Sequence, residues 1–425
     1  MTRRVRSHVA PYALTVLAVC VPLGFGERVG AEFAGEDQQP MDWPAMITRL
    51  KQELYRNPGV AHTRQQLAIA YNNYGVSLSN EGRWELAMQQ FEEAMRLDGA
   101  NADLRNNVGS SYLHQANEAY GRHDIDGAVG ILRKAIGIAP DLVQAYMLLG
   151  KIEYDRQRLK EARAAWQRVM ELDPTQKDIA KQLSRVNDEL PLESKFERLW
   201  QAYFDLRYEE RLERPVGFDI RDALLDARRT VGSDFAYWPT HKIVVLIYSA
   251  ESFRALRQET PEWMAGQFDG KIRVPLPSAK LDQVAVKGIL YHEYTHALIH
   301  DLTNDKCPGW LNEGLAEYEG RTQFSAPLSL LAKAQGAQQL IPWQTLSGHI
   351  SPSLPVDEVR LAYEQSYSLA AYLLERYRFW RIRRILKAIG EGRAWEDALA
   401  DELRVKLPRL ESNWREWLPE FLRAH

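Results

Sequence analysis

The chain reads YHEYTHALI from Tyr291 to Ile299, and this stretch sets several metal-binding side chains at a spacing that one ion can use. His292 and His296 are four residues apart, so on a helix both imidazoles lie on one face and can reach the same ion. Glu293 would project about 100° further round that helix, beside the ion rather than against it. From there its carboxylate can take a proton from a water held by the metal. The pattern therefore indicates a metal site on a helix.

The segment from Leu281 to His300 predicts a mostly buried helix. Its apolar residues include Val284, Val286, Ile289, Leu290, Ala297 and Leu298. Two histidines and a glutamate inside an apolar helix need partners, which a metal ion or hydrogen bonds between structural histidines would supply. The spacing from His292 to His296 is the H-E-x-x-H arrangement of zinc metallopeptidases. We therefore expect one zinc ion per chain.

A catalytic zinc site needs a third protein ligand and one open position. His300 is eight residues from His292, about 12 Å along a straight helix, so these two cannot share an ion. Leu302 stands where a third histidine six residues after His296 would be. The stretch WLNEGLAEY, which begins at position 310, predicts a second short helix. Within it Glu313 is the candidate third ligand.

The H-E-x-x-H motif followed by WLNEGLA resembles the gluzincin metallopeptidases and is most similar to the small peptidase MA-like domains. The resemblance implies that His292, His296 and Glu313 are the zinc ligands and that Glu293 is the general base. It also implies that Glu317, one turn after Glu313, orients a ligand imidazole. A plain surface glutamate is the alternative for Glu317.

Amide hydrolysis also needs a group that stabilises the oxyanion besides the metal. In the related aminopeptidases a tyrosine in a Tyr-Glu-Lys-Gly context has this role, and this chain has YEQSYS from Tyr363 to Ser368. We expect Tyr363 in the role, with Tyr367 as second choice. The alternative is that both tyrosines pack at the start of a helix from Ser366 to Tyr377. The exopeptidase motif Gly-x-Met-x-Asn is not seen before the zinc helix, so aminopeptidase activity does not follow.

The residues between the repeats described below and the zinc helix predict a mixed α and β structure. Strands are expected at Ala202–Tyr208 and Lys242–Tyr248, with a helix at Ile220–Val231 between them. GKIRVP from Gly270 to Pro275 predicts a short strand at a sheet edge, which proline tolerates. By the gluzincin resemblance an extended peptide substrate pairs with this edge, at Ile272, Arg273 and Val274, through main-chain hydrogen bonds. The Arg273 side chain would contact substrate or face solvent.

The N-terminal half of the chain repeats with a period of 34 residues. The aligned positions are Gly75, Gly109 and Gly150, and Ala87, Ala128 and Ala162, with seven extra residues near His114 to Tyr120. The pattern resembles three tetratricopeptide repeats at about 68–101, 102–142 and 143–176. An added helix is expected at Trp43–Arg56 and a capping helix at Asp178–Leu190. Such arrays expose a concave face that binds a peptide or a protein partner, although this array could also be only a scaffold.

Residues Met1 to Ala31 have the features of a targeting segment. Three arginines precede an apolar run from Val9 to Phe25, and Val29-Gly30-Ala31 suits cleavage. We therefore expect an exported bacterial protein, periplasmic or extracellular, whose leader is either removed or retained as a membrane anchor. If the leader is removed, Cys20 is removed with it, and Cys307 alone could not form an intrachain disulfide.

Length and composition agree with a multidomain chain. The 425 residues suggest two or three domains, and 45% hydrophobic residues is enough for sizeable cores. A net charge of −3 without a basic stripe gives no support for nucleic-acid binding. We predict a leader at 1–31, an all-α tetratricopeptide superhelix at 41–190, and an α+β zincin-like metallopeptidase domain with a helical C-terminal part at 194–425. The predicted function is zinc-dependent peptide hydrolysis; the alternative is a non-enzymatic adaptor or assembly protein with a structural or degenerate zinc domain.

Overall fold

The computed structural model describes residues 41–210, 212, 214–256, 267–276, 283–348, 350 and 354–425. They form two compact units that divide between Pro191 and Leu192. The predicted leader at residues 1–31 lies outside the described residues. Among the helices that are described, none has the length and apolar character needed to cross a bilayer.

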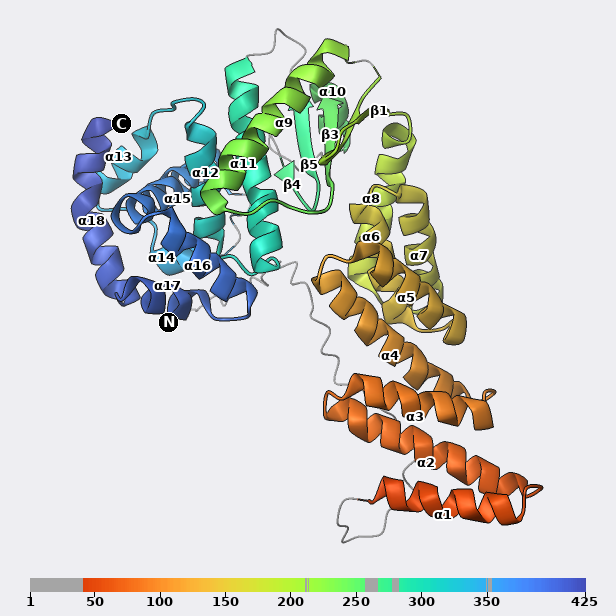
Figure 1. Cartoon of the computed structure of the whole chain (residues 1–425). Coiled ribbons are helices and arrows are strands. Elements are labelled where there is room, and N and C mark those ends of the chain that lie inside the picture. The colour runs from red at the N-terminus through yellow and green to blue at the C-terminus, as the bar shows by residue number, and fades with distance from the viewer. Residues whose placement is uncertain are drawn as a thin grey trace, which may run out of the picture. The chain divides into compact units, whose positions relative to one another are not determined.

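The N-terminal unit is a run of helices (Figure 1). They are α1 (Trp43–Arg56), α2 (Ala61–Asn80), α3 (Trp84–Leu97), α4 (Ala102–Gly121), α5 (Ile125–Ile138), α6 (Val143–Asp155), α7 (Leu159–Leu172) and α8 (Lys177–Glu193), whose last turn crosses the boundary between the units. The closest pairings are α2 with α3, α4 with α5 and α6 with α7. The predicted all-α repeat architecture is therefore confirmed.

Glycines explain why the helices of a pair pack so closely. A Cβ atom on Gly75 would lie 2.6 Å from the Phe91 ring, and one on Gly150 would overlap the Trp166 ring. Only a hydrogen atom leaves room for these rings. The extra length is not confined to the second repeat, because α2 and α4 both have 20 residues and α6 has 13. The difference of seven residues is about two helical turns.

The C-terminal unit contains a sheet whose strands are β1 (Glu197–Trp200), β2 (Phe204–Tyr208), β3 (Ile243–Ser249), β4 (Gln267–Phe268) and β5 (Ile272–Leu276). Their order in space is β1-β2-β3-β5-β4. The inner pairs β2 with β3 and β3 with β5 are parallel, whereas β1 and β4 are antiparallel to their neighbours. The predicted strands at β2 and β3 are confirmed. The sequence pattern missed β1 and β4, which are only four and two residues long.

The prediction that β5 is the edge strand is wrong. Gln267 of β4 pairs with Arg273, and Phe268 pairs with Ile272, while β3 pairs with β5 on its other side. The side chains of Ile272, Arg273 and Val274 are fully buried. Substrate contact at these three residues is therefore not supported, because β4 already takes the outer position beside Ile272 and Arg273.

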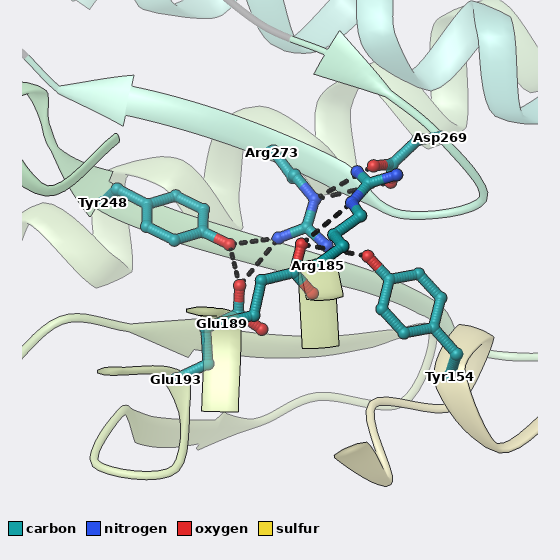
Figure 2. A network of polar contacts seen from close by, with 7 residues as sticks. All are labelled: Tyr154, Arg185, Glu189, Glu193, Tyr248, Asp269 and Arg273. Carbon is teal, nitrogen blue, oxygen red and sulfur yellow. Dashed lines mark hydrogen bonds and ion pairs between the residues drawn. The ribbon is translucent and has the colours of Figure 1, made fainter. Parts of the chain in front are cut away.

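Arg273 also does not face solvent. Its Nη1 lies 2.8 Å from Glu193 Oε1 and its Nε 3.2 Å from Asp269 Oδ2, and it donates to the Tyr248 hydroxyl oxygen (Figure 2). Tyr248 donates its own hydroxyl hydrogen to Glu193. A buried guanidinium needs such partners to offset the loss of its hydration. Arg273 is thus a structural ion-pair residue. The remaining side chains in Figure 2 belong to the N-terminal unit, where Glu189 accepts hydrogen bonds from Tyr154 and Arg185.

Ten helices are described in the C-terminal unit beside the sheet. They are α9 (Arg214–Phe235), α10 (Ala250–Leu256), α11 (Gln283–Thr303), α12 (Gly309–Arg321), α13 (Ser329–Gly336), α14 (Trp343–Leu346), α15 (Val356–Tyr377), α16 (Phe379–Gly390), α17 (Trp395–Leu403) and α18 (Leu407–Ala424). The central helix α11 packs against α9 and α12, and α12 packs against α15. The predicted start of α15 at Ser366 is wrong, because the helix begins at Val356, directly after Pro355 and with two acidic residues in its first turn. The predicted α+β fold with a helical C-terminal part is confirmed.

Candidate metal centre

Two imidazoles meet on one face of α11. This helix is buried on most of its surface, as the apolar residues around the histidines predict. The Nε2 atoms of His292 and His296 lie 3.0 Å apart, and the two rings are inclined by 83°. The helical spacing of four residues is enough to produce this convergence.

A carboxylate from α12 completes the group. Glu313 Oε2 lies 3.5 Å from His296 Nε2 and 3.7 Å from His292 Nε2. Two glycines let α12 come this near to α11, because a Cβ atom on Gly320 would lie 3.1 Å from the Gly288 carbonyl oxygen. The structure therefore brings together the three side chains that the gluzincin resemblance implies as ligands, all within 4.8 Å of one another.

The geometry of this group fits a zinc ion. Donor atoms around a tetrahedral zinc, with bonds of about 2.0–2.2 Å, lie roughly 3.3–3.5 Å from one another. Of the three observed distances, 3.5 Å lies within that range, 3.0 Å is slightly shorter and 3.7 Å is slightly longer. Two imidazoles and one carboxylate are also a donor set that zinc accepts. The neighbouring Glu293 Oε2 is buried and has no hydrogen-bond partner within the described part of the chain, as suits a carboxylate that would bind a water or a substrate.

Each histidine keeps its second nitrogen for an acceptor. His296 Nδ1 donates to Asn312 Oδ1 at 2.9 Å, and His292 Nδ1 lies 3.4 Å from Glu317 Oε1. These contacts favour the tautomer in which Nε2 is an unprotonated ligand. Glu317 thus lies where a ligand-orienting carboxylate is needed. The sequence prediction missed Asn312, although it directly precedes Glu313 on the same short helix.

Burial controls the acid strength of the site. It raises the pKa of Glu293 to about 8. Burial lowers the pKa of His292, and the adjacent His296 lowers it further. For His296 burial acts in the same direction, but Glu313 and other polar neighbours outweigh it and raise the pKa to about 9. Two imidazole nitrogens 3.0 Å apart cannot both carry protons, so the pair is suited to share one cation. A carboxyl with the pKa of Glu293 can accept and return a proton near neutral pH.

Tyr363 shares the electrostatic environment of this group. Tyr363 lies on α15 and is partly buried, and burial raises its pKa well above the usual value. The negative charges of Glu313, Glu293 and Glu317 raise this pKa further, in that order. A phenol in this environment stays protonated and can donate a hydrogen bond.

Tyr367 has a different environment. Its ring lies 4.7 Å from the Arg321 guanidinium and 5.8 Å from the Phe421 ring, between centroids. Only 7% of the residue is exposed. Tyr367 is therefore a packing residue beside the site, and Tyr363 is the better candidate for oxyanion contact.

His300 is outside the group, as its distance along α11 predicts. Its Nδ1 lies 3.5 Å from Asp301 and its Nε2 3.3 Å from Asp305. Both nitrogens of the ring therefore face carboxylates at the C-terminal end of the helix, so this histidine connects the end of α11 to the loop that follows it.

Comparisons with known proteins agree with this division of the chain. The profile of the Peptidase MA superfamily matches residues 260–420, and a tetratricopeptide repeat profile matches residues 68–101. The chain thus contains a Peptidase MA superfamily domain, preceded by tetratricopeptide repeats.

The chain is also similar to RNA polymerase II-associated protein 3. It is 25% identical to the Homo sapiens protein and 23% identical to the Mus musculus protein, in each case over 141 residues. The match covers 33% of this chain and only 20% of either relative.

Similar solved structures include the Arabidopsis OM64 TPR domain, which is 24% identical in sequence and has a TM-score of 0.23. The match covers 29% of this chain and 96% of that domain. The first TPR of Spaghetti (RPAP3) bound to an HSP90 peptide is 22% identical and has a TM-score of 0.23, and the match covers 30% of this chain and 98% of that chain. MamA is 17% identical and has a TM-score of 0.22, and the match covers 35% of this chain and 80% of that chain.

Proposed function

We propose that this protein is a zinc-dependent peptidase that hydrolyses peptide bonds with a water molecule. The proposal is carried by one observation: His292, His296 and Glu313 converge beside Glu293, a buried carboxyl whose Oε2 has no hydrogen-bond partner in the part of the chain that is described. A purely structural zinc site would be closed by a fourth protein ligand and would need no such carboxyl.

The proposed mechanism assigns one task to each residue. Zinc, when held by His292, His296 and Glu313, would supply Lewis acidity toward the substrate carbonyl and the attacking water. Glu293 takes one proton from that water as its oxygen bonds to the carbonyl carbon. Glu293 then gives this proton to the amide nitrogen as the carbon–nitrogen bond breaks.

Tyr363 would stabilise the negative charge that develops on the carbonyl oxygen. Donors aimed at a developing oxyanion lower the barrier because they are already oriented before the reaction. Burial and the negative charges of the site carboxylates raise the pKa of Tyr363, so its hydroxyl stays protonated and can donate. Tyr367 is not given this role.

The tetratricopeptide repeats would bind a protein partner or the substrate itself. Support comes from the three helix pairs and from the similarity to a protein whose name describes it as associated with RNA polymerase II. The same similarity favours the second candidate, a non-enzymatic adaptor whose zinc domain is structural or degenerate. The repeats alone do not separate these two candidates.

Export remains part of the proposal, on the features of residues 1–31. The protein would act in the periplasm or outside the cell, with its leader removed or kept as an anchor. The N-terminal sequence of protein recovered from separated cell fractions tests this: a new terminus near Glu32 supports removal. Recovery of the intact N-terminus in the soluble cytoplasmic fraction would contradict export.

The decisive experiment compares three purified proteins, the wild type, Glu293→Gln and the double variant His292→Ala, His296→Ala. The wild type should hold about one zinc per chain by elemental analysis and cleave peptides from a quenched fluorescent library. Glu293→Gln should keep its zinc and lose activity by about 10²- to 10⁴-fold. The double variant should lose the metal. Zinc without any cleavage by the wild type would favour the adaptor, and no zinc under metal-replete conditions would overturn the proposal.

A further inference from the structure

Arg321, the last residue of α12, makes three contacts at once. Its Nε lies 2.9 Å from Glu317 Oε2, and its Nη1 donates to the Ala326 carbonyl oxygen at 2.7 Å. The flat face of the guanidinium lies over the Tyr367 ring, 4.7 Å from its centroid. Only 12% of the Arg321 side chain is exposed. The group is therefore fixed in direction by a carboxylate, a carbonyl and an aromatic ring.

Glu317 connects this guanidinium to the candidate metal centre. One carboxylate oxygen, Oε1, lies 3.4 Å from His292 Nδ1, and the other, Oε2, receives the ion pair from Arg321. Each oxygen thus has a separate partner on opposite sides of one carboxylate. The spacing of four residues between Glu317 and Arg321 places both on the same face of α12.

We infer that Arg321 is a positioning residue for the metal centre, acting through Glu317 on His292. This inference rests on the proposed function. Without the guanidinium, the Glu317 carboxylate would lose the partner that holds its second oxygen, and it is 17% exposed, enough to turn toward water. His292 would then lose its Nδ1 acceptor, and its ring would no longer be held with Nε2 toward the site.

Tyr367 has a role in this arrangement. The Arg321 guanidinium packs against the face of its ring, so α15 helps to hold the ion pair in place. The Ala326 carbonyl brings the segment after α12 to the same guanidinium. The preceding turn of α12, the segment that follows it and the distant helix α15 therefore all contact Arg321, and its position depends on all three.

The test measures zinc affinity by competition with a chromogenic chelator, using the full chain. Arg321→Met should weaken zinc binding by about 10- to 100-fold, which is the usual effect of removing an outer partner of a metal ligand. Arg321→Lys should restore part of the affinity, because it keeps the charge but not the fork of donors. Tyr367→Phe should retain the affinity, because it keeps the ring.

A double-mutant cycle separates positioning from general stabilisation. Glu317→Gln alone should weaken zinc binding, and Arg321→Met added to it should have little further effect, because both changes break one chain of contacts. The matched control is Arg415→Met on α18. Arg415 forms an ion pair with Glu411, which is four residues earlier on the helix, as Glu317 is for Arg321. This variant should leave zinc affinity unchanged.

Each outcome decides the question. Fully additive losses in the cycle, or unchanged zinc affinity in Arg321→Met, would overturn the inference while the wild-type zinc site stands. A wild type that binds no zinc would overturn the proposed function and the inference together. Circular dichroism and thermal unfolding of the metal-free proteins check that Arg321→Met folds, and Arg321→Lys supplies the comparison if it does not.

Discussion

The substitution Gly314→Ala tests how closely the candidate metal centre depends on helix packing. Gly314 follows Glu313 on α12 and faces α15. A Cβ atom there would lie 2.9 Å from the Ser366 carbonyl carbon and 3.0 Å from Ala370 Cβ, and still nearer to the Ser366 oxygen. Ordinary contacts of this kind are 3.4–4 Å long. The helices must therefore move apart by at least about 0.5 Å, and backbone cannot yield as a flexible side chain does.

We expect two measurable effects from this displacement. Overpacking of a dense core costs about 1–3 kcal/mol, so the free energy of unfolding in urea should fall by that amount. The shift also acts on Glu313, one residue away, so zinc affinity should fall by about tenfold or more. Peptide cleavage, where it is detected in the wild type, should fall further, because catalysis is sensitive to misplacement of about 1 Å.

The matched control is Gly336→Ala at the end of α13, where an added Cβ atom meets nothing within 4 Å. Its unfolding free energy should stay within about 0.5 kcal/mol of the wild type, with zinc affinity unchanged. The reasoning is refuted if Gly314→Ala is as stable as this control and binds zinc as tightly as the wild type. In that case α12 and α15 would be able to separate without effect on the site.

Three further predictions concern stability, each measured by urea unfolding. Burial lowers the pKa of His300, but hydrogen bonds to the carboxylates of Asp301 and Asp305 outweigh it and raise the pKa to about 9. The free energy of unfolding should therefore fall as pH rises from about 6.5 through 9, by at most about 3 kcal/mol. The variant His300→Gln should lose this pH dependence. Burial raises the pKa of Glu319 to about 8, so the free energy of unfolding should fall as pH rises from about 4.5 to 8, by at most about 5 kcal/mol. If Glu319→Gln shows the same pH dependence of unfolding as the wild type, this prediction is wrong. Gly130→Ala should stabilise the N-terminal unit by about 0.5–1 kcal/mol, because α5 leaves space there; a loss of stability would show that the space is needed.

The features that the sequence predicted well are those set by local periodicity. The segment from Leu281 to His300 predicted a buried helix, and α11 runs from Gln283 to Thr303. Because a helix is stiff, a spacing of four residues is nearly enough to place two imidazoles side by side. Gly75 and Gly150 were also visible as repeat positions, and each stands sixteen residues before the aromatic residue that packs against it, Phe91 or Trp166.

The features that escaped prediction depend on contacts between distant parts of the chain. The two residues of β4 carry no strand pattern of their own, yet they take the edge position that Pro275 suggested for β5. The partners of Arg273 include Glu193, eighty residues away, so the sequence around β5 could not show that its charge is buried. Arg321 likewise meets Tyr367 only because α12 packs against α15.

The three glutamates of α12 show where local reasoning stops. Glu313 and Glu317 are four residues apart, so both turn toward α11 and its histidines. Glu319 is two residues further, about 200° round the helix, and a count of residues would place it on a solvent-facing side. It is instead 1% exposed, and its carboxylate oxygens have no hydrogen-bond partner among the residues described. Burial, together with the charge of Asp234 at the end of α9, raises its pKa to about 8. Sequence spacing therefore fixes the direction of a side chain, whereas its acid strength depends on whether another element covers that direction.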